Sequence, residues 1–229
     1  MTLRKPFHVR APGRICLFGE HSDYLDLDVI TAATEFEIKI VAAPRDDNTI
    51  CVRYHDIGEE DEFPVDTLLA HRHKRDYLRS AFNVIHEEKI TLKYGWDVEV
   101  SGNIPVAGGL SSSSALSVAS IMLAAHMGGK ELRPVEIVRL AYEAEVEHFG
   151  ESGGMMDHYA SVFGNLIHVG MISDKKVTRL PAELNGFIIG DSRLKKKDTV
   201  GDLNQLRRKI FAGYKLIRKK LPNFDPRPT

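Results

Sequence analysis

The sequence has 229 residues, and its 31 lysines and arginines against 32 aspartates and glutamates leave a formal net charge of −1 at pH 7. This balance excludes a strongly basic protein of the kind that coats nucleic acid or an anionic membrane. Two cysteines are too few for a disulfide framework, no hydrophobic run is long enough to span a bilayer, and residues 1–14 lack the apolar core of a signal peptide. We therefore expect a cytoplasmic α/β protein with neither a nucleic-acid nor a membrane partner.

Alternating residues predict several strands in the first hundred residues. In residues 35–43 the hydrophobic side chains fall on one face and the charged ones on the other, and residues 49–54 and 96–102 alternate in the same way. Residues 76–88, between the last two strands, instead repeat their hydrophobic side chains at helical spacing. This order indicates antiparallel strands with a helix packed against them.

Helices are expected to dominate after residue 109. Residues 114–127 are hydrophobic on nearly every side, which is typical of a buried helix, and residues 133–150 form a second helical stretch that opens near a proline and stops at a glycine. Two short strands are predicted at residues 165–170 and 185–191.

A basic amphipathic helix is predicted at residues 202–221. Its lysines and arginines are compatible with RNA or anionic lipid, but we favour a solvated outer face, because no other part of the chain is strongly basic. We expect its hydrophobic side to face a core through Leu203, Leu206, Ile210, Ile217 and Leu221.

Four serines follow two glycines at the start of the buried helix, in the stretch PVAGGLSSSSALSVAS. A glycine turn that enters a helix leaves backbone N–H groups unpaired, and the helix dipole adds positive potential, so this loop is a candidate phosphate site. It lacks the lysine of a Walker A loop. Taken by themselves, these residues are equally compatible with an N-capped buried helix after a flexible turn.

A second polar segment covers residues 11–28. Arg14, Glu20, His21 and Asp23 lie within ten residues, and such a set can surround sugar hydroxyls, each of which both donates and accepts hydrogen bonds. Arg14 can also stabilise the negative charge of a transferring phosphoryl group. One alternative is a metal site formed by His21 and Asp23, but two ligands are too few for such a site. The other is a polar loop whose side chains form hydrogen bonds with one another.

A third segment covers residues 144–161, where an acidic helix end and a glycine turn precede Asp157. An aspartate in this place can cap the next helix, or it can accept a proton from a substrate hydroxyl. The composition does not separate these two interpretations.

Together and in this order, the three segments resemble the GHMP kinase superfamily. Pro105–Ser114 match its phosphate loop, P-x-x-x-G-L-[GS]-S-S-[AS], position by position. The first segment is similar to the galactokinase signature G-R-x-N-L-I-G-E-H-T-D-Y, and SGGMMDH is similar to the galactokinase motif P-C-G-I-M-D-Q, with His158 in place of the glutamine.

The resemblance implies an α+β fold. Its first domain, expected at residues 1–180, has a mixed, mostly antiparallel sheet with packed helices and a left-handed β-α-β crossover. Residues 181–229 are expected to begin a second α+β domain. The superfamily's third motif, G-x-G-G, has no match here, so we expect a second domain that is cut short.

The resemblance also implies a site. Asp157 is the expected catalytic base with Arg14 beside it, and Ser113 with Glu145, or alternatively Glu147, is expected to ligate Mg²⁺. The expected sugar-binding residues are Glu20, His21, Asp23 and Tyr24. The expected ATP-binding residues are Pro105, Gly108, Gly109, Leu110, Ser111, Ser112, Ser113 and Ser114.

The activity implied by this site is transfer of the γ-phosphoryl group of Mg·ATP to the anomeric hydroxyl of a galactose-like sugar. After Tyr24 the chain continues LDLD instead of the usual N-x-G, so arabinose, galacturonate and a heptose phosphate are alternative acceptors. The resemblance is also compatible with a non-catalytic sugar sensor and with a kinase that acts on mevalonate. Nothing in the sequence indicates an oligomeric state.

Overall fold

The structure is a computed structural model, which describes residues 5–65, 67–105, 108–171, 176–182, 186–190 and 199–225. Its described strands form one sheet in the order β4-β3-β5-β2-β6-β7, with β1 paired to β2. All pairs are antiparallel except β3 with β5. The strands are β1 (Phe7–Phe18), β2 (Val29–Pro44), β3 (Thr49–Tyr54), β4 (Glu59–Pro64), β5 (Trp96–Gly102), β6 (Leu166–Val169) and β7 (Val177–Arg179).

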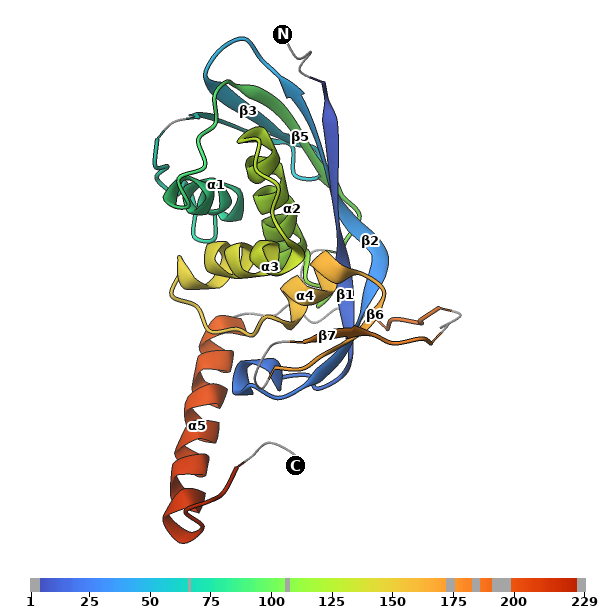
Figure 1. Cartoon of the computed structure of the whole chain (residues 1–229), viewed down its shortest axis with the longest axis vertical. Coiled ribbons are helices and arrows are strands. Elements are labelled where there is room, and N and C mark those ends of the chain that lie inside the picture. The colour runs from blue at the N-terminus through green and yellow to red at the C-terminus, as the bar shows by residue number, and fades with distance from the viewer. Residues whose placement is uncertain are drawn as a thin grey trace.

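Four helices pack against one face of this sheet (Figure 1). They are α1 (Tyr77–Glu87), α2 (Ser112–Met127), α3 (Pro134–Tyr142) and α4 (Met156–Phe163). Two single turns complete the layer: a 3₁₀ turn, η1 (Asp23–Leu25), and a π-helical turn, η2 (Glu143–Glu147), which continues α3. The result is the mixed α+β architecture with a mostly antiparallel sheet that the sequence predicts.

Helix α2 lies at the centre of the core. It contacts α1, α3 and α4 on its sides and β1 and β2 beneath it, and Ile121 and Leu123 are fully buried. This position explains why the helix is hydrophobic on nearly every side, since most of it is buried and only His126 among its residues is exposed. It also fixes the start of α2, where the serine loop lies, against the sheet.

Strand β1 is bent where the site begins. Its pairing with β2 shifts register between Pro12 and Arg14 and again between Cys16 and Phe18. A β-bulge bends a strand and redirects the following side chain, and the first shift immediately precedes Arg14. Residues 11–28 were interpreted from the sequence as one polar segment, whereas the structure makes residues 11–18 of it part of a strand.

The predicted elements agree with the structure at most positions. Strands 49–54 and 96–102 are confirmed residue for residue, residues 35–43 lie within the longer β2, and 165–170 contains β6. The strand predicted at 185–191 is wrong for residues 186–190, which form no ladder, while 185 and 191 lie outside the described residues. Strands β1, β4 and β7 were not predicted from the sequence.

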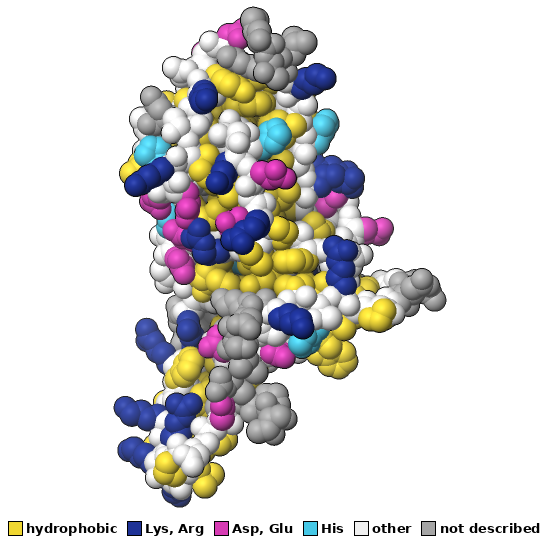
Figure 2. Space-filling model, viewed as in Figure 1, with side chains coloured by type: hydrophobic (Ala, Val, Ile, Leu, Met, Phe, Trp, Pro, Cys, Tyr) yellow, Lys and Arg dark blue, Asp and Glu magenta, His cyan; other side chains and the backbone are white. Residues whose placement is uncertain are grey.

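Helix α5 (Thr199–Lys220) confirms the predicted basic helix and corrects its environment. It extends away from the sheet, and Lys and Arg side chains cover much of it (Figures 1 and 2). The prediction that this helix has a core side is wrong for Leu206, Ile217 and Leu221, which are 39%, 39% and 60% exposed, while Ile210 is partly buried. No described helix or strand packs extensively along α5. The side chain of Leu203 lies outside the description. Within the described residues, no helix is both long and apolar enough to cross a membrane.

Candidate functional site

The three polar segments of the sequence meet at one cavity of about 490 Å³. It opens between the end of β1, the turn η1, the serine loop, the π-helical turn η2 and the start of α4. Arg14 and Asp157, which are 143 positions apart, both line it. The other predicted residues on its wall are Glu20, His21, Asp23, Tyr24, Gly109, Leu110, Ser111, Ser112, Ser113, Ser114 and Glu145.

Three predicted residues lie outside the cavity wall. Pro105 and Gly108 form the turn that leads into the serine loop, where the Gly108 N–H donates to the Pro105 carbonyl over 3.2 Å. Glu147 is exposed at the end of η2, whereas Glu145 is buried and lines the cavity. Of the two glutamates considered for a cation, only Glu145 is therefore in position.

Asp157 is held by two side chains from distant parts of the chain. The Nε of Arg14 donates to Oδ1 over 2.6 Å, and the hydroxyl of Ser111 donates to Oδ2 over 2.6 Å. Arg14 is itself fixed, because its Nη1 donates to the Gly109 carbonyl over 2.8 Å. The carboxylate is thus oriented before any ligand enters, and its side chain remains 26% exposed to the cavity.

These contacts keep Asp157 ionised. Burial raises the pKa of Asp157, but the charge of Arg14 and the hydrogen bonds from Ser111 and Arg14 outweigh it, so the pKa lies below its usual range. Burial lowers the pKa of the Arg14 guanidinium, and the charge of Asp157 more than compensates. The pair is an ionised carboxylate and a guanidinium at the wall of a cavity.

The serine loop has the backbone of an anion site. Gly109 and Ser111 adopt positive φ angles of 78° and 60°, which turn the chain sharply into α2. No hydrogen bond from the backbone N–H groups of Ser112, Ser113 or Ser114 is found among the described residues. These donors lie at the positive end of the helix dipole, where phosphate oxygens are bound most readily.

Asp23 caps the helix that carries Asp157. Its Oδ2 accepts a hydrogen bond from the Met156 N–H over 3.1 Å, so capping of α4 falls to Asp23 and leaves Asp157 free of that role. The contact requires a glycine at position 154, where a Cβ would lie 1.9 Å from Oδ2 of Asp23. Burial and the nearby charge of Asp157 raise the pKa of Asp23 against the opposing effect of the Met156 N–H.

The remaining residues of the first segment form a polar rim. Glu20 and His21 are exposed at the cavity, and His21 adopts a left-handed φ of 61°. Tyr24 is buried, and its hydroxyl has no hydrogen-bond partner within the described part of the chain. A buried hydroxyl without a partner beside a cavity is a position where a ligand group can complete the hydrogen bonding.

Ser113 and Glu145 bring oxygen ligands to the same cavity. Hydroxyl and carboxylate oxygens are suitable for Mg²⁺, which usually takes few protein ligands and completes its shell with phosphate oxygens and water. Oε2 of Glu145 is buried and makes no aligned hydrogen bond among the described residues. Glu145 lies in the π-helical turn, a rare local structure that often occurs at functional sites.

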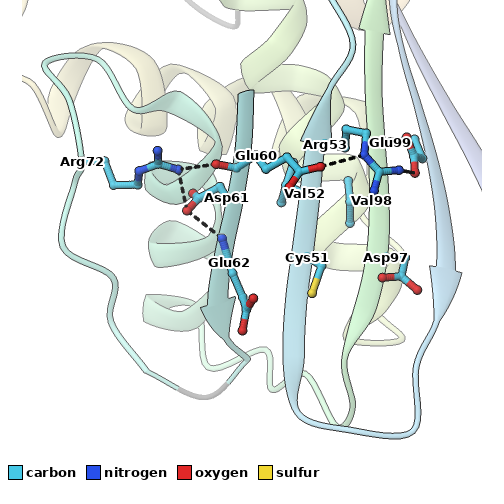
Figure 3. A pocket seen from close by; sticks show the side chains of 10 residues that line it. All are labelled: Cys51, Val52, Arg53, Glu60, Asp61, Glu62, Arg72, Asp97, Val98 and Glu99. Carbon is cyan, nitrogen blue, oxygen red and sulfur yellow. Dashed lines mark hydrogen bonds and ion pairs between the residues drawn. The ribbon is translucent and has the colours of Figure 1, made fainter. Parts of the chain in front are cut away.

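A larger hollow of about 700 Å³ lies elsewhere, on the outer face of β3, β4 and β5 (Figure 3). Both arginines that line it are paired with carboxylates of the same hollow: Arg53 contacts Glu60 and Glu99 over 3.0 and 2.8 Å, and Arg72 contacts Asp61 over 2.7 Å. No sequence motif falls here, and we assign this hollow no function.

Comparison with known families identifies the fold. Residues 76–165 match the family described as GHMP kinases N terminal domain, and residues 3–44 match the galactokinase galactose-binding signature. The chain belongs to the GHMP kinase superfamily.

Among curated relatives, this GHMP kinase chain is similar to galactokinases. It is 31% identical over 220 residues to galactokinase of Mannheimia succiniciproducens, a match that covers 93% of this chain and 57% of the relative. It is 30% identical to galactokinase of Actinobacillus succinogenes, covering 92% and 58%. The chain therefore spans less than two thirds of the length of these relatives.

Solved structures share the fold. Lactococcus lactis galactokinase complexed with galactose superposes with a TM-score of 0.79 at 21% identity, covering 97% of this chain and 59% of that one. A D-glycero-D-manno-heptose 1-phosphate kinase from Bacteriodes thetaiotaomicron gives a TM-score of 0.68 at 22% identity, covering 78% and 60%.

Two features of this GHMP kinase site were missed in the sequence. His158 lines the cavity beside Glu145, although the sequence marked it only as a departure from the signature glutamine. Arg75 and Glu151 form a 2.6 Å ion pair on the cavity wall. Nothing in the sequence connects Arg75 to Glu151, because the two lie far apart in the chain and belong to no shared motif.

Proposed function

We propose that this protein transfers the γ-phosphoryl group of Mg·ATP to the anomeric hydroxyl of a galactose-like sugar. The observation that carries the proposal is the position of Asp157. Arg14 and Ser111 hold its carboxylate in the cavity that the serine loop and Asp23 also line. Phosphoryl transfer to an alcohol needs a phosphate site and a hydroxyl site beside the same carboxylate, and the candidate residues for both sites line one cavity with Asp157.

The nucleotide phosphates are assigned to the serine loop. Two features support this assignment. The backbone N–H groups of Ser112–Ser114 have no partner among the described residues, and the dipole of the 16-residue helix α2 attracts negative charge to the same place. Ser113 and Glu145 would hold Mg²⁺, which when bound neutralises charge on the β- and γ-phosphate oxygens. The similarity to galactokinases and GHMP kinases supports ATP as the phosphate donor.

The acceptor is assigned to the rim formed by Glu20, His21, Asp23 and Tyr24. Carboxylates accept hydrogen bonds from sugar hydroxyls, the imidazole can donate or accept, and the Tyr24 hydroxyl supplies both functions. The galactokinase relatives and the match to a galactose-binding signature support a galactose-like sugar. The altered LDLD sequence after Tyr24 keeps arabinose, galacturonate and a heptose phosphate in the test panel.

The chemical step is an in-line transfer. The sugar oxygen attacks the γ-phosphorus, the bond to the β-γ bridging oxygen breaks, and ADP leaves while Asp157 receives the hydroxyl proton. Because the pKa of Asp157 is lowered, the carboxylate is ionised at neutral pH and acts chiefly by orienting the hydroxyl, as a loose transition state allows. The positive charge of Arg14 stabilises the transferring group.

The test is Mg·ATP-dependent ADP release by the 229-residue chain with galactose, arabinose, galacturonate, a heptose phosphate and mevalonate. We expect release with one sugar and none with mevalonate, because the rim presents polar groups for several hydroxyls. Release with mevalonate alone would contradict the sugar assignment. A folded chain that binds a sugar but releases no ADP would instead indicate a non-catalytic sugar sensor.

A further inference from the structure

His158 occupies a position that the proposed reaction does not yet use. It follows Asp157 on α4, is 1% exposed, and stands where the galactokinase motif has glutamine. The ring of Tyr142 lies edge-on to the imidazole with 5.6 Å between ring centres, which limits its movement. A fully buried imidazole beside a candidate catalytic carboxylate requires a physical explanation.

The partner of His158 is Glu145. Nε2 of the imidazole lies 2.7 Å from Oε2 of Glu145, although the contact is not aligned as a hydrogen bond. Both atoms are buried, and neither has another hydrogen-bond partner among the described residues. Oε2 thus faces His158, which leaves the second oxygen of Glu145 for the cavity that the side chain lines.

This arrangement resembles the support that metal ligands receive in proteins. A carboxylate that binds a cation through one oxygen is commonly held by a hydrogen-bond donor on the other, and loss of that donor typically weakens metal affinity about 10- to 100-fold. Imidazole and carboxamide both offer an N–H donor. That shared property explains how histidine can replace the glutamine of the motif.

We propose that His158 is a positioning residue that holds Glu145 for the divalent cation of the bound nucleotide. The inference rests on the proposed function for the presence of the cation, and it assigns His158 no contact with substrate. Its direct consequence is that a side chain at position 158 without an N–H donor weakens cation binding and leaves the affinity for metal-free nucleotide unchanged.

The experiment uses Mn²⁺ as the probe and measures its binding to the full chain with a non-hydrolysable ATP analogue, by the electron paramagnetic resonance signal of free Mn²⁺. We expect His158→Leu to weaken Mn²⁺ binding about 10- to 100-fold and His158→Gln to remain within about threefold of the unsubstituted chain. If His158→Leu does not fold, His158→Asn replaces it, because the shorter carboxamide cannot reach Glu145 as glutamine can.

His168→Leu is the matched control. His168 also pairs with a carboxylate, Asp28, over 3.1 Å, but it lies on β6 and does not line the cavity. This variant should bind Mn²⁺ as the unsubstituted chain does. Equal Mn²⁺ binding by His158→Leu and the unsubstituted chain would overturn the proposal, as would a nitrogen hyperfine coupling that makes His158 a direct ligand.

The same measurements distinguish a failure of the proposed kinase function from a failure of the proposed role of His158. If the unsubstituted chain binds Mn²⁺ with the nucleotide analogue and His158→Leu loses this binding, the positioning role stands even when no sugar is phosphorylated. If the chain phosphorylates a sugar and His158→Leu binds Mn²⁺ normally, the kinase stands and the positioning role is rejected. If no cation binds with the nucleotide, both the cation site and the role of His158 are rejected.

Discussion

Asp157 carries a carboxylate whose two oxygens accept hydrogen bonds from Arg14 and Ser111 before any ligand arrives. Each contact favours the charged form, and together they outweigh burial. The aspartate therefore presents a fixed, ionised acceptor with lone pairs still free for a substrate hydroxyl. Orientation at this residue is established by groups 46 and 143 positions away in the sequence.

Ser111→Ala tests this account of Asp157. Removing the hydroxyl deletes a hydrogen bond to the charged form, so the pKa of Asp157 should rise. Because the ionised form is the active one, activity is lost as pH falls through this pKa, and the acid limb of the kcat profile should move to higher pH. Ser112→Ala removes a neighbouring hydroxyl without a contact to Asp157 and should leave the limb in place. An unmoved limb in Ser111→Ala would contradict the role of Ser111.

Gly154→Ala tests the role of Asp23. The added Cβ would lie 1.9 Å from Oδ2 of Asp23, so the carboxylate must leave the start of α4. Loss of a charge-assisted hydrogen bond costs about 1.5–3 kcal/mol, and we expect the sugar KM to rise by about tenfold or more with a lower Tm. Gly213→Ala in α5 meets no neighbouring atom and serves as the control. An unchanged KM in Gly154→Ala would remove Asp23 from the acceptor pocket.

Strand β4 was not predicted because it carries a buried charged residue whose partner lies on another element. Asp61 and Phe63 both point inward from this strand, but an aspartate at an inward position breaks the hydrophobic alternation. Its partner is Arg79 of α1, whose Nε and Nη2 lie 2.8 and 2.7 Å from the two carboxylate oxygens. That partner is visible only in three dimensions, so β4 could not be predicted from its own residues.

The Arg79→Met variant measures how much the ion pair between Asp61 of β4 and Arg79 of α1 contributes to the free energy of unfolding. Breaking a buried ion pair costs about 3–5 kcal/mol, and we expect roughly 2 kcal/mol here because Arg72 still contacts Asp61. Urea unfolding near pH 7 is the measurement. Arg133→Met breaks only an exposed pair and should leave stability nearly unchanged. A loss no larger than in that control would contradict a structural role for the pair.

The same pair predicts a pH dependence with a defined sign. Burial raises the pKa of Asp61, but hydrogen bonds from Arg79 and Arg72 outweigh it, so the folded-state pKa is lowered. Its stabilising contribution is therefore present above the unfolded value, about 3.9, and is lost as pH falls through the folded one. The difference in free energy of unfolding between the unsubstituted chain and Arg79→Met should become smaller below about pH 4. A difference that stays constant would contradict the linkage.

Other elements also differ between the sequence prediction and the structure, and each difference has a physical cause. Strand β1 resembles a polar loop in sequence because its register shifts and its glycine interrupt the alternation that marks a strand. The turn η2 cannot be told from continuous α-helix in sequence because a π-helical turn has no signature in residue type. Strands 49–54 and 96–102 were predicted completely because their alternation is unbroken.

For the whole molecule, the order of the three motifs predicted the fold and most of the residues that line the cavity, but Pro105, Gly108 and Glu147 lie outside its wall, and Arg75 and Glu151 were missed. The motifs did not predict which residues touch: the Ser111–Asp157 and His158–Glu145 contacts, and the capping of α4 by Asp23, depend on tertiary placement. We propose residues 1–180 as one domain, since every described strand ends by Arg179. The predicted core side of α5 failed because no described element packs extensively along it.

The most direct test of the central claim is phosphorus NMR of the 229-residue chain and its Asp157→Asn variant, each with Mg·ATP and galactose. We predict that the unsubstituted chain forms ADP and a sugar 1-phosphate in equal amounts. The variant should be slower by about 10²- to 10⁴-fold while it binds the ATP analogue equally well. Sugar phosphate formed by Asp157→Asn at the unsubstituted rate would contradict the assignment of Asp157 and the account of the site built around it.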